Sequence, residues 1–168
     1  MGKSGTLWIK VVEKSYTPMP PGTTSNTIYS GTFERSIDAK NRVTIPSRWL
    51  AEEEEEFYSV VNPRDHFLIL MPPGEFANVE NSLIEQGIPA AERRPFIRQF
   101  YGNSQIVTAD KQGRILLPVD HCSRTGLKDN VVIIGSKSRF EIWSAERWAA
   151  AKSEETTTYQ KVADLIGL

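Results

Sequence analysis

Two short segments hold the residues best suited to chemistry. Residues 38–46 have the sequence DAKNRVTIP, and residues 110–118 have the sequence DKQGRILLP. In both, an aspartate precedes an arginine by four positions, and a lysine lies between them. An arginine guanidinium can bind a phosphate or donate two hydrogen bonds to guanine, whereas two aspartates can act as acid and base in hydrolysis. The segments therefore allow either nucleic-acid recognition or hydrolysis.

Hydrolysis is the weaker of these hypotheses. Asp38 and Asp110 are each followed by cationic residues, and a nearby arginine lowers the pKa of a carboxylate and keeps it an anion. The sequence has no nucleophile–base set, phosphate-binding loop or dinucleotide-binding motif. We therefore expect neither enzymatic activity nor a small-molecule substrate.

Metal binding is also disfavoured. His66 and His121 are the two histidines, and Cys122 is the single cysteine. A metal site needs three or four convergent ligands, and the chain has no C-x-x-C or H-x-x-x-H spacing. We expect no metal and no other cofactor, with His66 in a turn and Cys122 packed on a short helix.

Strand–turn–strand units must position the two motifs. The alternating patterns of residues 32–38 and 104–110 predict strands, and residues 42–46 and 114–118 predict the strands that return from each turn. A turn between two strands projects its side chains away from the body of the protein, where an arginine can meet a phosphate or a base.

Particular residues are expected to fix these turns. Asp38 and Asp110 can accept backbone N–H groups and form Asx-turns. Asn41 and Gly113 occupy the position that needs a positive φ, which glycine and asparagine tolerate best. A preformed turn loses less entropy on binding. The competing interpretation is that each Asp–Arg pair is purely structural and only stabilises its own hairpin.

The same order of elements follows each motif. The first half predicts a short helix capped by Ser47, strands over 57–61 and 67–71, and an amphipathic helix over 72–87. The second half predicts a short helix ending at Gly126, strands over 130–136 and 139–143, and a helix capped by Ser144. A connecting helix over 89–102 must begin or kink at Pro95.

A repeat of about 45 residues is too short to build a stable core alone. Two copies can solve this by pairing strands around a shared pseudo-twofold axis, which predicts a mainly β, α+β fold: one β-barrel made of two half-barrels. The expected boundaries are a flexible N-terminal extension over 1–28 that includes a short strand at 6–12, repeat 1 over 29–76, connecting helices over 77–102, repeat 2 over 103–148 and a helical tail over 149–168.

Charge is distributed unevenly along a chain whose net charge is only −1. Residues 51–90 carry one arginine and nine acids, a net charge of −8, and five of the acids form the run Glu52 to Glu56. Residues 29–50 sum to +2 and residues 91–150 to +4. A neutral chain can therefore present a positive face that attracts a polyanion. We interpret the glutamate run as a solvated helix end.

The order of elements, with D-x-x-x-R heading a strand that proline closes, resembles the SpoVT/AbrB family of DNA-binding proteins. Two such units, with the flanking segments IYSGTFERSIDAKNRVTIPSRW, ERRPFIRQFYGNSQIVTADKQGRILLP and VVIIGSKSRFEIWSAERW, are similar to the MraZ family of bacterial transcriptional regulators. The resemblance extends from about Tyr29 to Trp148.

This resemblance implies a pseudo-twofold, swapped-hairpin β-barrel, a ring of commonly eight subunits, and binding of double-stranded promoter DNA through the repeated loops. Carried over by position, the implied DNA-binding residues are Lys40, Arg42, Lys111 and Arg114, with Asp38, Asn41, Asp110 and Gly113 fixing the loops. It further implies a repressor of its own promoter and of the division and cell-wall gene cluster. Ring neighbours present one motif in one orientation, so we expect the target to be short direct repeats.

Two features depart from the family pattern. Asn41 stands where the family usually has glycine, and relatives typically begin near the position of Tyr29. The mildly basic extension is either a DNA-binding arm, a misassigned or altered start, or simply disordered, and we favour disorder. The lack of a secretory signal, of a membrane-spanning run and of a second cysteine predicts a cytoplasmic protein with no membrane partner. The DNA binding that the resemblance implies would also make it nucleoid-associated.

Other side chains leave further alternatives open. The aromatic residues Trp49, Phe67, Phe76, Phe140, Trp143 and Trp148 recur in both halves and predict core and subunit interface. Arg93, Arg94 and Arg98 either line the ring or pair with glutamates of a neighbouring subunit, the second being preferred. The rival function is an oligomeric adaptor that binds a protein and uses its arginines structurally.

Overall fold

The computed structural model describes residues 27–64 and 66–168. The strand expected over 6–12 and the flexible linker after it lie outside the described residues. The strands are β1 (Thr32–Ser36), β2 (Arg42–Thr44), β3 (Glu56–Val61), β4 (Leu68–Met71), β5 (Gln105–Thr108), β6 (Arg114–Leu116), β7 (Asn130–Gly135) and β8 (Phe140–Ser144). The helices are η1, a 3₁₀ turn (Ser47–Trp49), α1 (Pro73–Ala77), α2 (Val79–Glu85), α3 (Ala90–Gly102), α4 (Val119–Thr125) and α5 (Ala145–Ile166).

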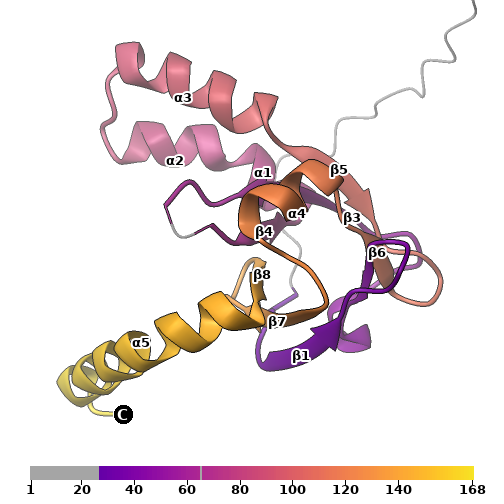
Figure 1. The fold of residues 1–168 in the computed structure, drawn as a ribbon. Helices are drawn as coiled ribbons and strands as arrows, with labels where there is room; N and C mark the ends of the chain where they lie inside the picture. The colour runs from indigo at the N-terminus through magenta and orange to yellow at the C-terminus, as the bar shows by residue number, and fades with distance from the viewer. Residues whose placement is uncertain (1–26, 65) are drawn as a thin grey trace, which may run out of the picture.

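Strands of the two repeats interlock. The larger sheet has the order β1-β7-β8-β4-β3-β5, and the smaller sheet consists of β2 and β6 (Figure 1). All of the assigned pairs are antiparallel. Strand β1 of the first repeat pairs with β7 of the second, while β5 of the second repeat pairs with β3 of the first. The expected mainly β, α+β fold is confirmed, and its hairpins are exchanged between the repeats.

The register of the strands preserves the repeat. The two motifs are 72 positions apart, whereas β3 and β7 are offset by 74 because the second repeat has two more residues before β7. With these offsets, the pair Arg35–Val131 corresponds to the pair Val107–Phe57. In the smaller sheet Val43 faces Ile115, its own counterpart. A pseudo-twofold axis therefore passes between β2 and β6 and between β4 and β8.

One apolar cluster lies between the two sheets. Val43 and Ile115 of the smaller sheet are completely buried and pack with Phe57, Leu68 and other inward residues of the larger sheet. Trp49 and Phe140 belong to the same cluster, with ring centroids 5.2 Å apart. The smaller sheet is thus supported from beneath by the largest side chains of the core.

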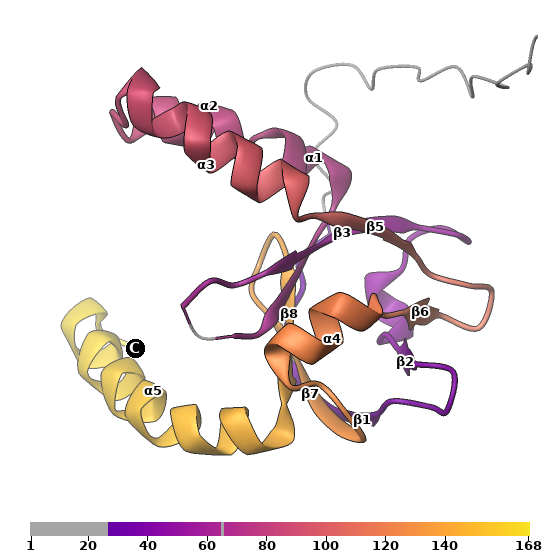
Figure 2. The same ribbon diagram turned by 45° about the horizontal axis from the view of Figure 1, so that its top comes forward.

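A second cluster covers the outer face of the larger sheet. Phe67 stacks on Trp143, and Phe76 stacks on Tyr58 with centroids 3.9 Å apart. The hydroxyl of Tyr101 donates to the carbonyl of Phe76 at 3.0 Å. These contacts fix α1 and α3 on the sheet, and α2, α3 and α5 project on the side opposite to β2 and β6 (Figure 2).

The aromatic residues lie in the two clusters as expected, but only Phe76 and Trp148 recur at equivalent places in the two halves. Of the six expected in core or interface, five are buried and Trp148 packs half-buried on the outer cluster. Phe67 is not the counterpart of Phe140, however, because it faces the outer cluster whereas Phe140 faces the inner one. Leu68 takes the inner place, since a shift of one residue moves a strand side chain to the opposite face.

Several predicted helix bounds are wrong. No helix runs through Glu52 to Glu56: after the single turn η1 the chain makes a turn in which Glu54 has a φ of 59°. Ser47 lies inside η1 and does not cap it. The helix expected over 72–87 is divided at Asn78 into α1 and α2.

The other helix signals agree with the structure. Ser144 caps α5 by accepting the backbone N–H of Arg147 at 3.1 Å, and Gly126 ends α4 in the left-handed conformation. The exception is Pro95, which lies inside α3 and does not begin it, because the helix begins at Ala90. Among the described helices, none is both long enough and apolar enough to cross a membrane.

Candidate nucleic-acid interface

The first loop, Asp38–Arg42, joins β1 to β2 and is closed by its own aspartate. Oδ1 of Asp38 accepts the backbone N–H groups of Lys40 and Arg42, both at 2.9 Å. Backbone bonds from Asn41 to the carbonyl of Asp38 and from Asp38 to the carbonyl of Arg42 complete the turn. Asn41 has a φ of 62°, the left-handed conformation that the turn needs.

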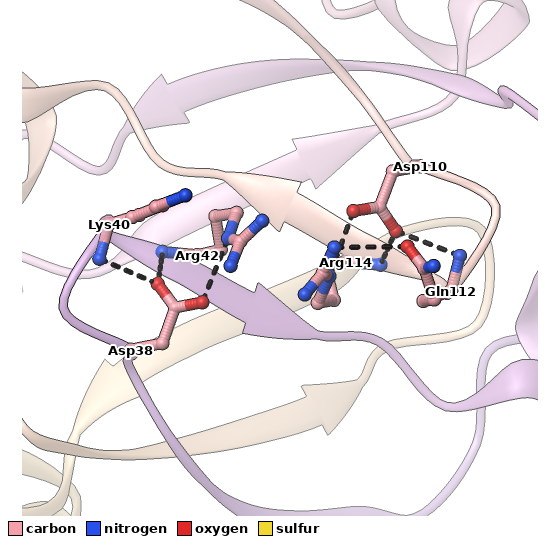
Figure 3. A network of polar contacts seen from close by, with 6 residues as sticks. All are labelled: Asp38, Lys40, Arg42, Asp110, Gln112 and Arg114. Atoms are coloured by element: carbon pink, nitrogen blue, oxygen red, sulfur yellow. Dashed lines mark hydrogen bonds and ion pairs between the residues drawn. The ribbon is translucent and has the colours of Figure 1, made fainter.

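The second loop, Asp110–Arg114, joins β5 to β6 with the same geometry. Oδ1 of Asp110 accepts the N–H groups of Gln112 and Arg114 at 2.9 Å (Figure 3). Gly113 has a φ of 74°. Its lysine, Lys111, occupies the second position of the loop, whereas Lys40 occupies the third position of the first loop. The two loops therefore share a backbone but not the placement of their lysines.

Each aspartate also orients the arginine four residues later. Nε of Arg42 donates to Oδ2 of Asp38 at 2.8 Å, and Nε of Arg114 donates to Oδ2 of Asp110 at 2.9 Å. Nη2 of Arg114 also donates to the side chain of Gln112 at 3.0 Å. Across the described part of the chain, the terminal nitrogens of Arg42 have no hydrogen-bond partner. Its guanidinium is held at one edge and open at the other.

Both aspartates are permanent anions at neutral pH. The backbone N–H of Arg42 is the main cause that lowers the pKa of Asp38, and the side chain of Arg42 and the N–H of Lys40 lower it further against partial desolvation. The pKa of Asp110 is lowered in the same way by Arg114 and Gln112. These carboxylates hold loops and guanidinium groups in place, and they lack the raised pKa of a general acid.

The smaller sheet brings both arginines to one surface. Arg42 pairs with Leu116 and Thr44 pairs with Arg114, on either side of the buried Val43–Ile115 pair. Because strand side chains alternate between faces, these four side chains share the outward face. We call this two-stranded surface, with the first and second loops at its ends, the ribbon.

Asn41 links the first loop to the opposite repeat. Its Nδ2 donates to the carbonyl of Leu117 at 2.7 Å and lies 3.6 Å from Sγ of Cys122. At the matching place beside the second loop, a side chain on Gly113 would meet Cδ1 of Leu50 at 3.2 Å. In the first loop the larger residue Asn41 thus faces the small Cys122, and in the second loop Gly113 faces the large Leu50.

The remaining candidates lie away from the ribbon or inside the protein. His66 lies in the β3–β4 loop with a φ of 55°. Cys122 is buried on α4, and burial raises the pKa of its thiol. Arg93 donates to the carbonyl of Ile88 on the helical side. Among the described residues no group of histidine, cysteine or carboxylate side chains could hold a metal ion.

His121 has a structural role that the sequence did not reveal. It is completely buried, its Nδ1 lies 2.8 Å from the hydroxyl of Ser59, and its Nε2 lies 3.0 Å from the carbonyl of Asn103. A carbonyl only accepts, so Nε2 carries the proton and the serine donates to Nδ1. The one available signal was its position, 72 residues after the core residue Trp49.

Comparison with known proteins finds one matching family and several relatives. Residues 100–167 match the family described as "MraZ protein, putative antitoxin-like". A protein named transcriptional regulator MraZ from Symbiobacterium thermophilum is 36% identical over 137 residues, which cover 82% of this chain and 99% of that protein. Proteins of the same name from Heliobacterium modesticaldum and Syntrophomonas wolfei are 34% and 31% identical over 139 residues, covering 83% and 82% of this chain and 96% and 95% of theirs.

Proposed function

The chain belongs to the MraZ family, and from that membership we propose that it is a DNA-binding transcriptional regulator. The relatives are named as regulators and not as enzymes, so we assign no catalytic activity to the chain. The cytoplasm, in association with the nucleoid, is the location where such a regulator acts.

The observation that carries this proposal is the preorganised ribbon. Two arginines related by a pseudo-twofold axis lie on one outward surface, each aligned by an aspartate, above the buried Val43–Ile115 pair. The major groove of DNA is about 12 Å wide and admits a two-stranded β-ribbon. Arginine can bind guanine through two hydrogen bonds there, or a phosphate at the groove edge. Lys40 and Lys111, both exposed in the loops, are further cationic side chains at this surface.

Association of several copies of the chain would give a useful affinity for DNA although each copy offers few cationic side chains. Binding strength grows with the number of phosphates a protein neutralises, and one ribbon supplies only four cationic side chains. A ring of identical chains, octamer-like in size, multiplies these contacts through effective concentration. Neighbouring copies related by rotation present the same loops in the same orientation, which suits short direct repeats in the DNA. We place such repeats in the chain's own promoter and in the division and cell-wall cluster, with repression as the outcome.

Fluorescence anisotropy with DNA from upstream of the chain's own gene tests the proposal, with a shuffled duplex as reference. We expect preference for the upstream DNA, weakening with salt, and a loss of about tenfold or more in Arg42→Ala. Lys161→Ala serves as the matched control, because it removes one exposed positive charge from α5 on the side opposite to the ribbon. Equal affinity for both duplexes at every salt concentration would exclude sequence-specific regulation.

A protein-binding adaptor is the second candidate. Tyr159, Leu165 and Ile166 on α5 are each more than two-thirds exposed, which suits contact with another protein. Folded oligomers that ignore DNA at low salt but bind a protein independently of salt would favour this alternative.

A further inference from the structure

The two hairpins that carry the loops have equal charge. Residues 32–44 and residues 104–116 each sum to +1. The loops also share their backbone hydrogen bonds and their Asp–Arg distances. The loops themselves differ in the position of their lysine and in the bond from Arg114 to Gln112, and a larger difference in charge lies in the segments beside them.

The acidic turn, Glu52–Glu56, is fixed against the second loop. On one side of this turn, Leu50 lies against Gly113, and on the other the carbonyl of Glu55 accepts the N–H of Ala109 at 2.9 Å. The carboxylate of Glu55 accepts the N–H of Ala51 at 2.9 Å, which closes the turn on itself. Both ends of the acidic turn are thus attached to the two ends of the second loop.

The first loop has a different neighbour at the equivalent place. Cys122 lies beside Asn41, and the carbonyl of Asp129 accepts the N–H of Ile37 at 2.7 Å. The segment between these two contacts carries the exposed cations Arg124 and Lys128. Each loop is therefore flanked by a segment held through one side-chain contact and one backbone hydrogen bond. The segment beside the second loop carries glutamates, whereas the segment beside the first loop carries Arg124 and Lys128.

The charges of the two flanking segments differ by four. Residues 47–56, beside the second loop, contain one arginine and five glutamates and sum to −4. Residues 119–130, beside the first loop, contain two cations and two acids and sum to zero. In the described part of the chain none of the five glutamates forms an ion pair, and Glu52, Glu53 and Glu54 are exposed. The turn that carries these charges is attached beside the second loop at Gly113 and Ala109, and the screening length at physiological salt is about 8 Å.

We propose that the first loop, Asp38–Arg42, makes the DNA contact, and that the acidic turn keeps the DNA backbone away from the second loop, Asp110–Arg114. This inference rests on the proposed function and adds to it which repeat does the binding. Duplex DNA carries one negative charge per about 1.7 Å of its axis, so a turn with five glutamates and no ion pair among the described residues to neutralise them repels it. The second arginine then serves mainly to hold its own hairpin.

Anisotropy titrations of single and combined variants test this asymmetry. Arg42→Ala should weaken binding about tenfold or more, and Arg114→Ala by less than about twofold. The triple variant Glu52→Gln/Glu53→Gln/Glu54→Gln should tighten binding at low salt, and Arg114→Ala made in that background should cost about threefold or more. The matched control, Glu154→Gln/Glu155→Gln/Asp164→Asn, removes three exposed charges from α5 and should change affinity less.

The outcomes separate the two proposals. Equal losses for Arg42→Ala and Arg114→Ala in a protein that binds the upstream DNA would overturn the inference and leave the proposed function standing. A glutamate triple variant that behaves like its α5 control would also overturn the inference. Wild-type protein that shows no DNA binding would remove the proposed function itself.

Discussion

Each loop packs against one neighbouring side chain: Asn41 against the small Cys122, and Gly113 against the large Leu50. From this reciprocal packing we predict that the effect of a substitution at residue 113 on stability depends strongly on the side chain at residue 50. A side chain built on Gly113 would place its Cβ 3.2 Å from Cδ1 of Leu50 and 3.6 Å from the carbonyl oxygen of Ile45. Asn41 adopts nearly the same φ without conflict because Cys122 stands in the place of leucine. Gly113→Asn should therefore destabilise the protein, and Leu50→Cys should relieve that effect.

The magnitude follows from the two environments. Asparagine tolerates the left-handed conformation, so overpacking against Leu50 dominates and should lower the free energy of unfolding by about 1–3 kcal/mol. For a chain of this length each kcal/mol lowers the melting temperature by about 2–4 °C. In the Leu50→Cys background, the new amide can reach the carbonyl of Ile45 as Asn41 reaches that of Leu117. The cost of Gly113→Asn should then fall below about 0.5 kcal/mol.

Urea unfolding followed by tryptophan fluorescence measures this cycle, since Trp49 lies in the inner core. Wild type, both single variants and the double variant are compared at one protein concentration, because self-association would change the apparent stability. Asn41→Gly serves as the opposite control and should lose about 1 kcal/mol with its hydrogen bond. Additivity of the two substitutions within about 0.5 kcal/mol would refute the reciprocal-packing argument.

Two further predictions concern His121 and Ser144. Burial lowers the pKa of His121 below 6.5, so the unfolded chain binds a proton first, and the free energy of unfolding should fall as pH drops below 6.5, by up to about 1.4 kcal/mol per pH unit until the folded pKa is reached. Urea unfolding at successive pH values checks this: His121→Gln should lose the slope and the exposed His66→Gln should keep it, and an unchanged slope in His121→Gln would contradict the assignment. Ser144→Ala removes the cap of α5 and should lower the free energy of unfolding by about 1 kcal/mol. Ser153→Ala, at an exposed site within α5, is the control and should change it less. Equal effects of the two substitutions in thermal melts would argue against capping.

Local signals in the sequence predicted most of the loops and strands. A D-x-x-x-R turn depends on hydrogen bonds between residues no more than four positions apart, so its geometry is available from the segment itself. The same holds for the cap at Ser144 and the left-handed Gly126. DNA contact by the loop residues stays a prediction, because it depends on a partner.

Signals that depend on distant residues were harder to interpret. The glutamate run was expected to end a helix, but like charges at four-residue spacing repel each other in a helix, and Glu56 is instead paired with Thr108 of β5. His121 gave no local sign of burial, because its two partners come from β3 and from the end of α3. The positions of Glu56 and His121 depend on the exchange of strands between the repeats, so they cannot be predicted from any one segment of the sequence.

The fusion of two repeats in one chain explains how the halves can differ while the fold is retained. In a symmetric dimer of single repeats, any substitution beside one loop would appear beside the other. Here the strand register is the same in both halves, yet Trp49 corresponds to His121 and Leu50 to Cys122. Backbone pairing preserves the architecture, so side chains at equivalent places are free to diverge. A charge difference as large as that between residues 47–56 and 119–130 cannot arise in a dimer of identical repeats, and under the proposed asymmetry it would let the first loop bind DNA while the second supports the structure.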